Sequence, residues 1–195
     1  MSFSRLLLVA VSSKKYILDE GKDKVFVHPR ASLSSNDPYA GEVVLCFQLD
    51  DRKDKEKAVS RSLGIQESDR RCDGLIFYAQ DEQEDKVICL VEMKSTSIVD
   101  AAEQLKSTRD HIKSLLVAEC GTYCHKQLQH IKWKACFYHH GASPDNVVSV
   151  RRQLKKDNFD DVGDFTPANN DVGPFLRSEV STKELANKLR RGKKR

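Results

Sequence analysis

The chain lacks the features that mark several protein classes. No apolar run approaches the ~18 residues that a membrane-spanning helix needs. Only nine glycines and five prolines occur among 195 residues, and no internal repeat is visible, which excludes collagen, coiled-coil arrays and other repeat folds. Hydrophobic residues make up 39%, and charged residues at 32% exceed the usual ~25%. We therefore expect a soluble, charge-rich globular protein, long enough to bury a core without disulfides or a structural metal.

The cysteines and the N-terminus bear on the compartment of the protein. Cys46, Cys72 and Cys89 lie in or beside apolar, strand-like runs, which favours buried free thiols in a reducing environment. The apolar run 6–11 is short for a signal-peptide core and turns basic without a clear cleavage site. We therefore expect a cytoplasmic protein without membrane association, or a nuclear one in a eukaryote because of the basic tail.

Basic charge is concentrated at the C-terminus. Residues 186–195 carry six basic side chains and no acid, whereas residues 1–185 carry 27 basic and 29 acidic ones, a net charge of −2. Any affinity for a polyanion must therefore come from local patches and from the tail. A capping-box pattern and a following Gly192 predict a short helix over 182–191 that presents the tail. The candidate nucleic-acid-binding residues of the tail are Arg190, Arg191, Lys193 and Lys194.

The rest of the sequence predicts strands and helices in mixed order. Strands are expected where β-branched and apolar residues concentrate, at 24–28, 42–49, 71–79, 87–94 and 131–138. Apolar residues at spacings of three and four predict a helix over 98–118. A charged segment predicts a shorter helix over 54–63 that ends at Gly64. The polar turn 80–86 between two of the strands predicts a hairpin.

These elements predict a single α/β domain over residues 1–155. Gly141 and Pro144 are expected to close its regular part. The acidic, aperiodic stretch 156–180 is interpreted as a loop or linker, and 181–195 as the short helix and basic tail.

Three charged residues stand at the ends of the predicted hairpin strands: Asp73, Glu92 and Lys94. Side chains alternate between the faces of a strand, so Glu92 and Lys94 share a face. If the hairpin is symmetric about its turn, Asp73 faces Glu92 with Cβ atoms about 5 Å apart, close enough for both carboxylates to hold one Mg²⁺ or Mn²⁺. Acids and lysines on strands often only face solvent. Here the flanking apolar runs predict buried strands, where charge is costly unless it serves a purpose.

The motifs around these residues resemble those of the PD-(D/E)XK nuclease superfamily. Asp73-Gly74 begins one strand and Glu92-Met93-Lys94 ends the next, with Cys72 in place of the usual proline. Gln104-Leu105, ten residues after the lysine, is similar to the Gln-Leu helix motif of the RecB-like branch. The resemblance covers about residues 42–140 and implies a restriction-endonuclease-like αβββαβ core, a mixed sheet flanked by helices.

The resemblance also implies an activity, metal-dependent hydrolysis of phosphodiester bonds in DNA. It implies that the catalytic residues are Asp73, Glu92, Lys94 and Gln104. Asp73 and Glu92 would ligate Mg²⁺ or Mn²⁺. Members usually carry a further acid on the first core helix, for which Glu56 is favoured over Glu20 and Glu67.

Contacts to the substrate are expected from the helix after the site. Lys106, Arg109 and Lys113 recur there at three- and four-residue spacing and are candidate DNA-backbone contacts, although an ordinary solvated helix face has the same pattern. RNA remains an alternative substrate. The small size leaves little room for a specificity domain, so we expect loose specificity, a homodimer or a targeting partner protein.

Two other functions stay open. A catalytically silent nucleic-acid-binding or protein-interaction protein could have the same fold, because fold does not fix function. A small zinc-bearing interaction module is the second alternative, since cysteines and histidines near the last strand loosely fit the spacing of a structural zinc site. The candidate zinc ligands are Cys120, Cys124, His125, Cys136, His139 and His140.

Overall fold

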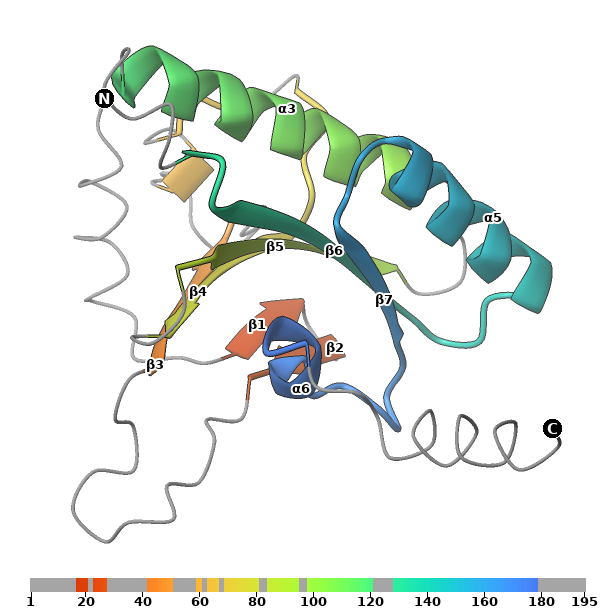
Figure 1. Ribbon diagram of the computed structural model, residues 1–195. Helices are drawn as coiled ribbons and strands as arrows, with labels where there is room; N and C mark the ends of the chain where they lie inside the picture. Colours follow the sequence, from red (N-terminus) through yellow and green to blue (C-terminus); the bar gives the residue numbers. More distant parts are fainter. Residues whose placement is uncertain are drawn as a thin grey trace, which may run out of the picture.

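The fold was analysed in a computed structural model, which describes residues 17–20, 23–27, 42–50, 59–60, 63–66, 69–80, 84–94, 98–120 and 128–178. Within these residues the chain forms a mixed five-stranded sheet flanked by helices (Figure 1). The predicted α/β architecture is confirmed at this level. No helix in the described ranges is long and apolar enough to cross a membrane.

The sheet has the strand order β3-β4-β5-β6-β7. Its strands are β3 (Glu42–Gln48), β4 (Gly74–Gln80), β5 (Lys86–Lys94), β6 (Ile131–His139) and β7 (Asp161–Phe165). The first three strands pair antiparallel, and β6 and β7 continue the sheet in parallel. Parallel neighbours need crossover connections, which α3 (Ala101–Cys120) and α5 (Pro144–Lys156) supply.

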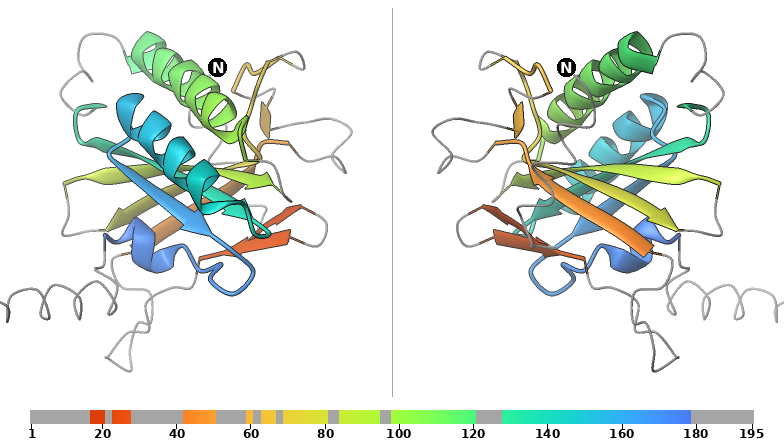
Figure 2. Two further views of the ribbon diagram at one scale, coloured as in Figure 1. Left: turned by 90° about the vertical axis from the view of Figure 1, so that its right-hand side faces the viewer. Right: turned by 90° about the vertical axis from the view of Figure 1, so that its left-hand side faces the viewer.

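Different elements cover the two faces of the sheet. Helices α3 and α5 lie together on one face, here called the helix face, and Figure 2 shows them there from both sides. The hairpin of β1 (Ile17–Glu20) and β2 (Asp23–Phe26) and the short helix α6 (Gly173–Leu176) cover the other, here called the hairpin face. The inner residues of β5 are buried on both faces, as its apolar run predicts.

Each face has its own apolar core, set by the alternation of side chains along the strands. The helix-face core includes Leu75, Leu90 and Phe137 of the sheet, packed with Leu105 of α3 and Leu154 of α5. The hairpin-face core includes Val25, Ile76, Cys89, Val91 and Leu176. The central strands are therefore enclosed by apolar layers, and their ends are where polar groups can gather.

The predicted helix stop at Gly64 is confirmed. Val59 and Ser60 are helical, and residues 54–58 and 61–62 of the predicted helix lie outside the described ranges. Gly64 has a φ of 69°, a conformation that glycine adopts without a steric penalty. The amide of Ile65 then donates to the carbonyl of Ser60 at 2.9 Å, as in the terminal turn of many helices.

The predicted end of regular structure at Gly141 and Pro144 is wrong, because Pro144 begins α5. The Ser143 side chain accepts a hydrogen bond from the amide of Asn146 at 3.3 Å and caps the helix. Proline at the first helical position loses no intrahelical hydrogen bond. Ser143-Pro144 was thus a helix-start signal.

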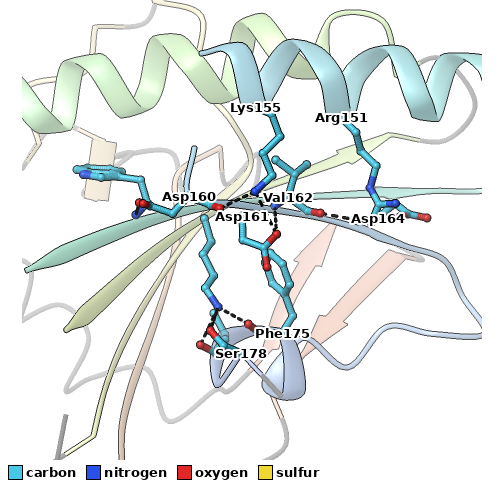
Figure 3. A network of polar contacts seen from close by, with 11 residues as sticks. Arg151, Lys155, Asp160, Asp161, Val162, Asp164, Phe175 and Ser178 are labelled. Atoms are coloured by element: carbon cyan, nitrogen blue, oxygen red, sulfur yellow. Dashed lines mark hydrogen bonds and ion pairs between the residues drawn. The ribbon is translucent and has the colours of Figure 1, made fainter. Parts of the chain in front are cut away.

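The interpretation of 156–180 as a loop or linker also needs correction, because β7 and α6 lie within it and share the cores of the domain. Asp161 and Asp164 make β7 look like a polar loop in the sequence. In the structure Lys155 and Arg151 of α5 pair with these aspartates at 3.3 and 2.9 Å (Figure 3). The domain boundary at residue 155 is therefore too early.

Buried Lys134 ties α6 to the sheet. Its ammonium donates to the carbonyls of Phe175 and Leu176 at 2.5 and 3.0 Å and to the Ser178 hydroxyl at 2.8 Å. It also lies 4.9 Å from the centre of the Phe175 ring. Burial lowers the pKa of Lys134 from its ordinary value of 10.5. The ammonium therefore completes the hydrogen bonding of the α6 C-terminus inside the protein.

We expect Lys134→Met to lower the free energy of unfolding by about 2 kcal/mol, because it leaves buried carbonyls without a donor. Lys132→Met, at a partly exposed position of the same strand, is the control and should change it by less than about 0.5 kcal/mol. Since the unfolded chain holds the Lys134 proton more tightly, the wild type should gain stability relative to Lys134→Met as the pH rises toward 10.5. Urea unfolding at several pH values measures both effects. Equal stability of wild type and Lys134→Met would contradict the assigned role.

Candidate active site

The hairpin register brings the two predicted metal ligands together. Gly74 pairs with Val91, so Asp73, immediately before β4, comes opposite Glu92 near the end of β5. This is the register that the symmetric turn predicts. Asp73 is a bend residue directly before β4, and its carboxylate reaches the backbone of β5 at Met93, next to Glu92. Two carboxylates therefore meet at one end of the sheet.

Asp73 is held by three elements of the fold. Its carboxylate accepts a hydrogen bond from the amide of Met93 in β5 at 2.5 Å, and only 6% of the residue is exposed. Its carbonyl accepts from the amide of Leu49 after β3 at 2.7 Å. The amide of Cys72 donates to the Thr108 hydroxyl of α3 at 2.9 Å. The carboxylate is thus held by β5, and the backbone around it is held by the residue after β3 and by α3.

Gln104 lies beside the segment that leads into Asp73. Its side-chain Nε2 donates to the carbonyl of Arg71 at 3.2 Å. Its Oε1 is buried and has no hydrogen-bond partner among the described residues. Thr108, one turn further along α3, donates to the carbonyl of Gln104 at 2.9 Å. The predicted Gln-Leu helix motif is therefore in contact with the segment before the first acid.

Glu92 and Lys94 form an ion pair at the end of β5. The ammonium of Lys94 lies 2.7 Å from Oε1 of Glu92. None of Glu92 is exposed, whereas the Lys94 side chain is 28% exposed. The contact confirms that both side chains share a face. The ammonium of a partly exposed lysine therefore contacts a fully buried carboxylate at this end of the sheet.

His139 joins this end of the sheet, although the sequence analysis considered it only as a zinc ligand. It pairs with Lys94 in the parallel register of β5 and β6 and is only 5% exposed. Its Nδ1 accepts hydrogen bonds from the amides of Gly141 and Ala142 at 3.3 and 3.1 Å. The sequence did carry a signal, because neighbouring parallel strands end at the same edge and His139 follows the predicted strand 131–138.

The Cys136 and His139 half of the zinc prediction is wrong. Residues three apart on a strand point to opposite faces. Cys136 belongs to the hairpin-face core, whereas the His139 ring stacks on Phe137 of the helix-face core at 6.0 Å between ring centres. Cys124 and His125 lie outside the described residues, as does the side chain of Cys120. Among described side chains, no group of three or more His, Cys, Asp or Glu could hold a metal ion.

The cysteines of the sheet are free, and most are buried, as predicted. Cys72, Cys89 and Cys136 are buried, and Cys46 is half-buried. Burial raises the pKa of Cys46 and Cys89 to about 12. Burial, followed by the nearby charge of Glu92, raises the pKa of Cys72. These thiols therefore stay protonated near neutral pH and are poor nucleophiles and poor metal ligands.

The predicted basic stripe on α3 needs one correction. Lys106 and Lys113 are exposed, but Arg109 is buried. Its guanidinium donates to the Asp157 carbonyl at the end of α5 and lies 4.7 Å from the centre of the Phe159 ring. Arg109 therefore joins α3 to α5 instead of facing solvent.

The other predicted site residues cannot be placed. Glu56, Glu67 and the tail residues Arg190, Arg191, Lys193 and Lys194 lie outside the described residues, as does the side chain of Glu20.

The chemistry of the cluster follows from its donor atoms. Asp73 and Glu92 offer carboxylate oxygens, the ligands that hard divalent cations prefer. Lys94 adds a cation that can contact an anionic substrate beside such an ion. Together these groups suit the binding of a divalent ion and a phosphate. Comparisons of the chain with protein-family models, with curated proteins and with solved structures give no match.

Proposed function

We propose that the protein is a metal-dependent nuclease of the PD-(D/E)XK type that hydrolyses phosphodiester bonds of DNA on a restriction-endonuclease-like core. One observation carries the proposal. The Asp73 carboxylate, directly before β4, accepts from the Met93 amide beside Glu92 at 2.5 Å, and the Lys94 ammonium contacts Glu92 at 2.7 Å, so all three charged residues gather at one end of the hairpin. Buried charges of this kind are costly to a fold, which favours a functional reason for their presence.

The donor set fits a hard divalent cation. Asp73 and Glu92 would hold Mg²⁺ or Mn²⁺, and two carboxylates leave coordination positions for water and a substrate phosphate, the usual arrangement for Mg²⁺. When bound, the ion would polarise a phosphoryl oxygen and lower the pKa of a water ligand.

The protein's own residues supply orientation and charge. The Met93 amide holds the Asp73 carboxylate in place, so little reorganisation is needed when a ligand arrives. Lys94 places an ammonium where negative charge builds on the phosphate. Low exposure keeps bulk water away and strengthens these electrostatic interactions.

DNA would be held by basic residues outside the cluster. Lys106 and Lys113 are exposed on α3, and residues 186–195 add six basic side chains without an acid. Phosphate contacts of this kind give affinity without sequence specificity. A homodimer or a targeting partner would then supply specificity.

Deletion of residues 186–195 should weaken DNA binding and flatten its salt dependence, because each phosphate contact contributes about 0.9 to the slope of log affinity against log salt. Turnover at saturating DNA should change little, since the tail carries no group for the chemistry. Fluorescence anisotropy at several salt concentrations measures the slope. An unchanged salt slope would show that residues 186–195 do not contact the DNA phosphates.

Arg109→Ala and Lys106→Ala should have opposite consequences. Arg109→Ala should lower the free energy of unfolding by about 2 kcal/mol, because a buried cation and its contacts between α3 and α5 are lost, while the salt slope of DNA binding stays at the wild-type value. Lys106→Ala should leave stability within about 0.5 kcal/mol and reduce the slope by about 0.9. If Arg109→Ala reduced the salt slope of DNA binding as much as Lys106→Ala does, the structural role of Arg109 and the DNA-contacting role of Lys106 would be contradicted.

Cleavage of DNA by the purified protein tests the proposed function. Wild type and Asp73→Asn are incubated with single-stranded, duplex and plasmid DNA and with RNA, in Mg²⁺, in Mn²⁺ and in EDTA. We expect metal-dependent cleavage of DNA by the wild type and none by Asp73→Asn. DNA binding without cleavage under all conditions would instead favour the silent binding protein, and stoichiometric zinc in the purified protein would favour the interaction module.

A further inference from the structure

The two ring nitrogens of His139 differ in their hydrogen bonding, because Nδ1 has partners and Nε2 has none among the described residues. Nδ1 accepts hydrogen bonds from two amides, those of Gly141 and Ala142, so it carries no proton. The proton of the neutral ring is then on Nε2. This Nε2 is buried and has no hydrogen-bond partner among the described residues. A buried donor without an acceptor is unfavourable, so a group that accepts a hydrogen bond from it would be stabilising.

The surroundings of the ring indicate where that group would lie. His139 is next to Lys94 in the register of β5 and β6, and its ring rests on Phe137 of the helix face. Nδ1 is turned to the loop that leads into α5, and α5 lies over the β7 side of the sheet (Figure 1). His139 and Lys94 are thus neighbours at the end of β5 and β6, and Nδ1 of the ring is already held by the loop.

We propose that the Nε2–H of His139 donates a hydrogen bond to a non-bridging oxygen of the substrate phosphodiester, beside the ammonium of Lys94, which makes His139 a further catalytic residue. The inference rests on the nuclease function proposed above. Lys94 is the partly exposed member of the cluster and sits on Glu92 at 2.7 Å. A phosphate oxygen bound beside Lys94 would complete the hydrogen bonding of the ring.

Two substitutions separate this role from a structural one. In His139→Asn, the side-chain oxygen lies near the position of Nδ1 and can still accept from the loop amides, but nothing reaches as far as Nε2. In His139→Gln, the amide nitrogen reaches the position of Nε2 and can still donate, but the acceptor for the loop is lost. His140→Asn, at the neighbouring exposed residue whose ring packs edge-on against Tyr138, is the matched control.

The experiment compares single-turnover DNA cleavage and urea unfolding for wild type, Asp73→Asn and the three histidine variants. We expect His139→Asn to cleave about 100-fold more slowly at near wild-type stability, on the scale of losing one preorganised donor. His139→Gln should cleave within about tenfold of wild type although its fold is less stable. A His139→Asn that is as active as His140→Asn, while Asp73→Asn is inactive, overturns the role of His139 and leaves the nuclease function standing. Inactive wild type on every substrate overturns the nuclease function, and the inference with it.

A measurement on the wild type covers the case in which a variant does not fold. The protein is labelled with ¹⁵N-histidine, and its side-chain resonances are followed while a short DNA oligonucleotide is added in Ca²⁺ instead of Mg²⁺. We expect the Nε2 resonance of His139 to carry the proton and to shift on DNA binding, while that of His140 shifts little. A His139 Nε2 resonance that stays in place at saturating DNA overturns the proposed contact.

Discussion

Lys94→Ala is expected to lower the turnover of DNA cleavage by roughly two to three orders of magnitude, the scale of losing one preorganised charge at the transition state. Affinity for Mg²⁺ should not fall, because lysine is not a ligand for hard cations. Single-turnover cleavage and calorimetric metal titration on the same preparation measure both quantities. Lys94→Arg should not restore turnover, since a planar guanidinium does not replace a compact ammonium.

The ion pair with Glu92 adds a second readout for Lys94. Removing Lys94 leaves the fully buried Glu92 without this counter-charge. Lys94→Ala should therefore unfold at lower urea concentration than wild type in EDTA, and saturating Mg²⁺ should restore much of the difference. Lys113→Ala, at an exposed position of α3, is the control for a lysine outside the cluster. Full cleavage activity in Lys94→Ala would remove the main support for the nuclease proposal.

Asp73→Asn and Glu92→Gln are expected to abolish metal binding and to reduce cleavage by about 1,000-fold or more, because each removes one of two carboxylate ligands. Both variants should fold. The asparagine Oδ1 can still accept from the Met93 amide, and loss of one of two facing buried charges relieves their repulsion. Calorimetric titration with Mg²⁺ and Mn²⁺ and urea unfolding measure the two effects.

The neighbouring acid Asp50 gives a matched control for these variants. It lies near the same end of the sheet but pairs with Arg71 at 2.9 Å. Asp50→Asn should therefore bind Mg²⁺ as wild type does. If Asp73→Asn binds the ion as tightly as Asp50→Asn, the metal ligands have been assigned to the wrong residues.

Much of the sheet was predictable from local patterns. The apolar run of β5 and the acidic turn before it fix a symmetric hairpin, and the pairing of Gly74 with Val91 follows. The strand β7 was not predictable in this way. Its five residues include Gly163 and two aspartates, and it is a strand because β6 offers a parallel edge and α5 offers cations. Its stability comes from tertiary contacts, which a local pattern does not contain.

The candidate site was predictable only in part, for the same reason. Asp73, Glu92 and Lys94 follow from the alternation along two strands of one hairpin. The burial of Arg109 depends on Phe159 and on the end of α5, 48 residues further along the chain at Asp157, and an amphipathic pattern cannot separate it from exposed Lys106. The position of His139 beside Lys94 depends on a parallel pairing across α3. Local sequence patterns predict the individual strands but do not show which strand becomes the parallel neighbour of β5.

The aspartates of β7 also bear on self-association. Strand β7 is an outer strand of the sheet, and an outer strand can pair with a strand from another molecule and start aggregation. Asp161 and Asp164 place partly exposed negative charges along this short edge, while their partners Lys155 and Arg151 belong to the covering helix. A second strand brought alongside β7 would have to accommodate these ion-paired side chains, and charged groups on an edge strand disfavour such pairing.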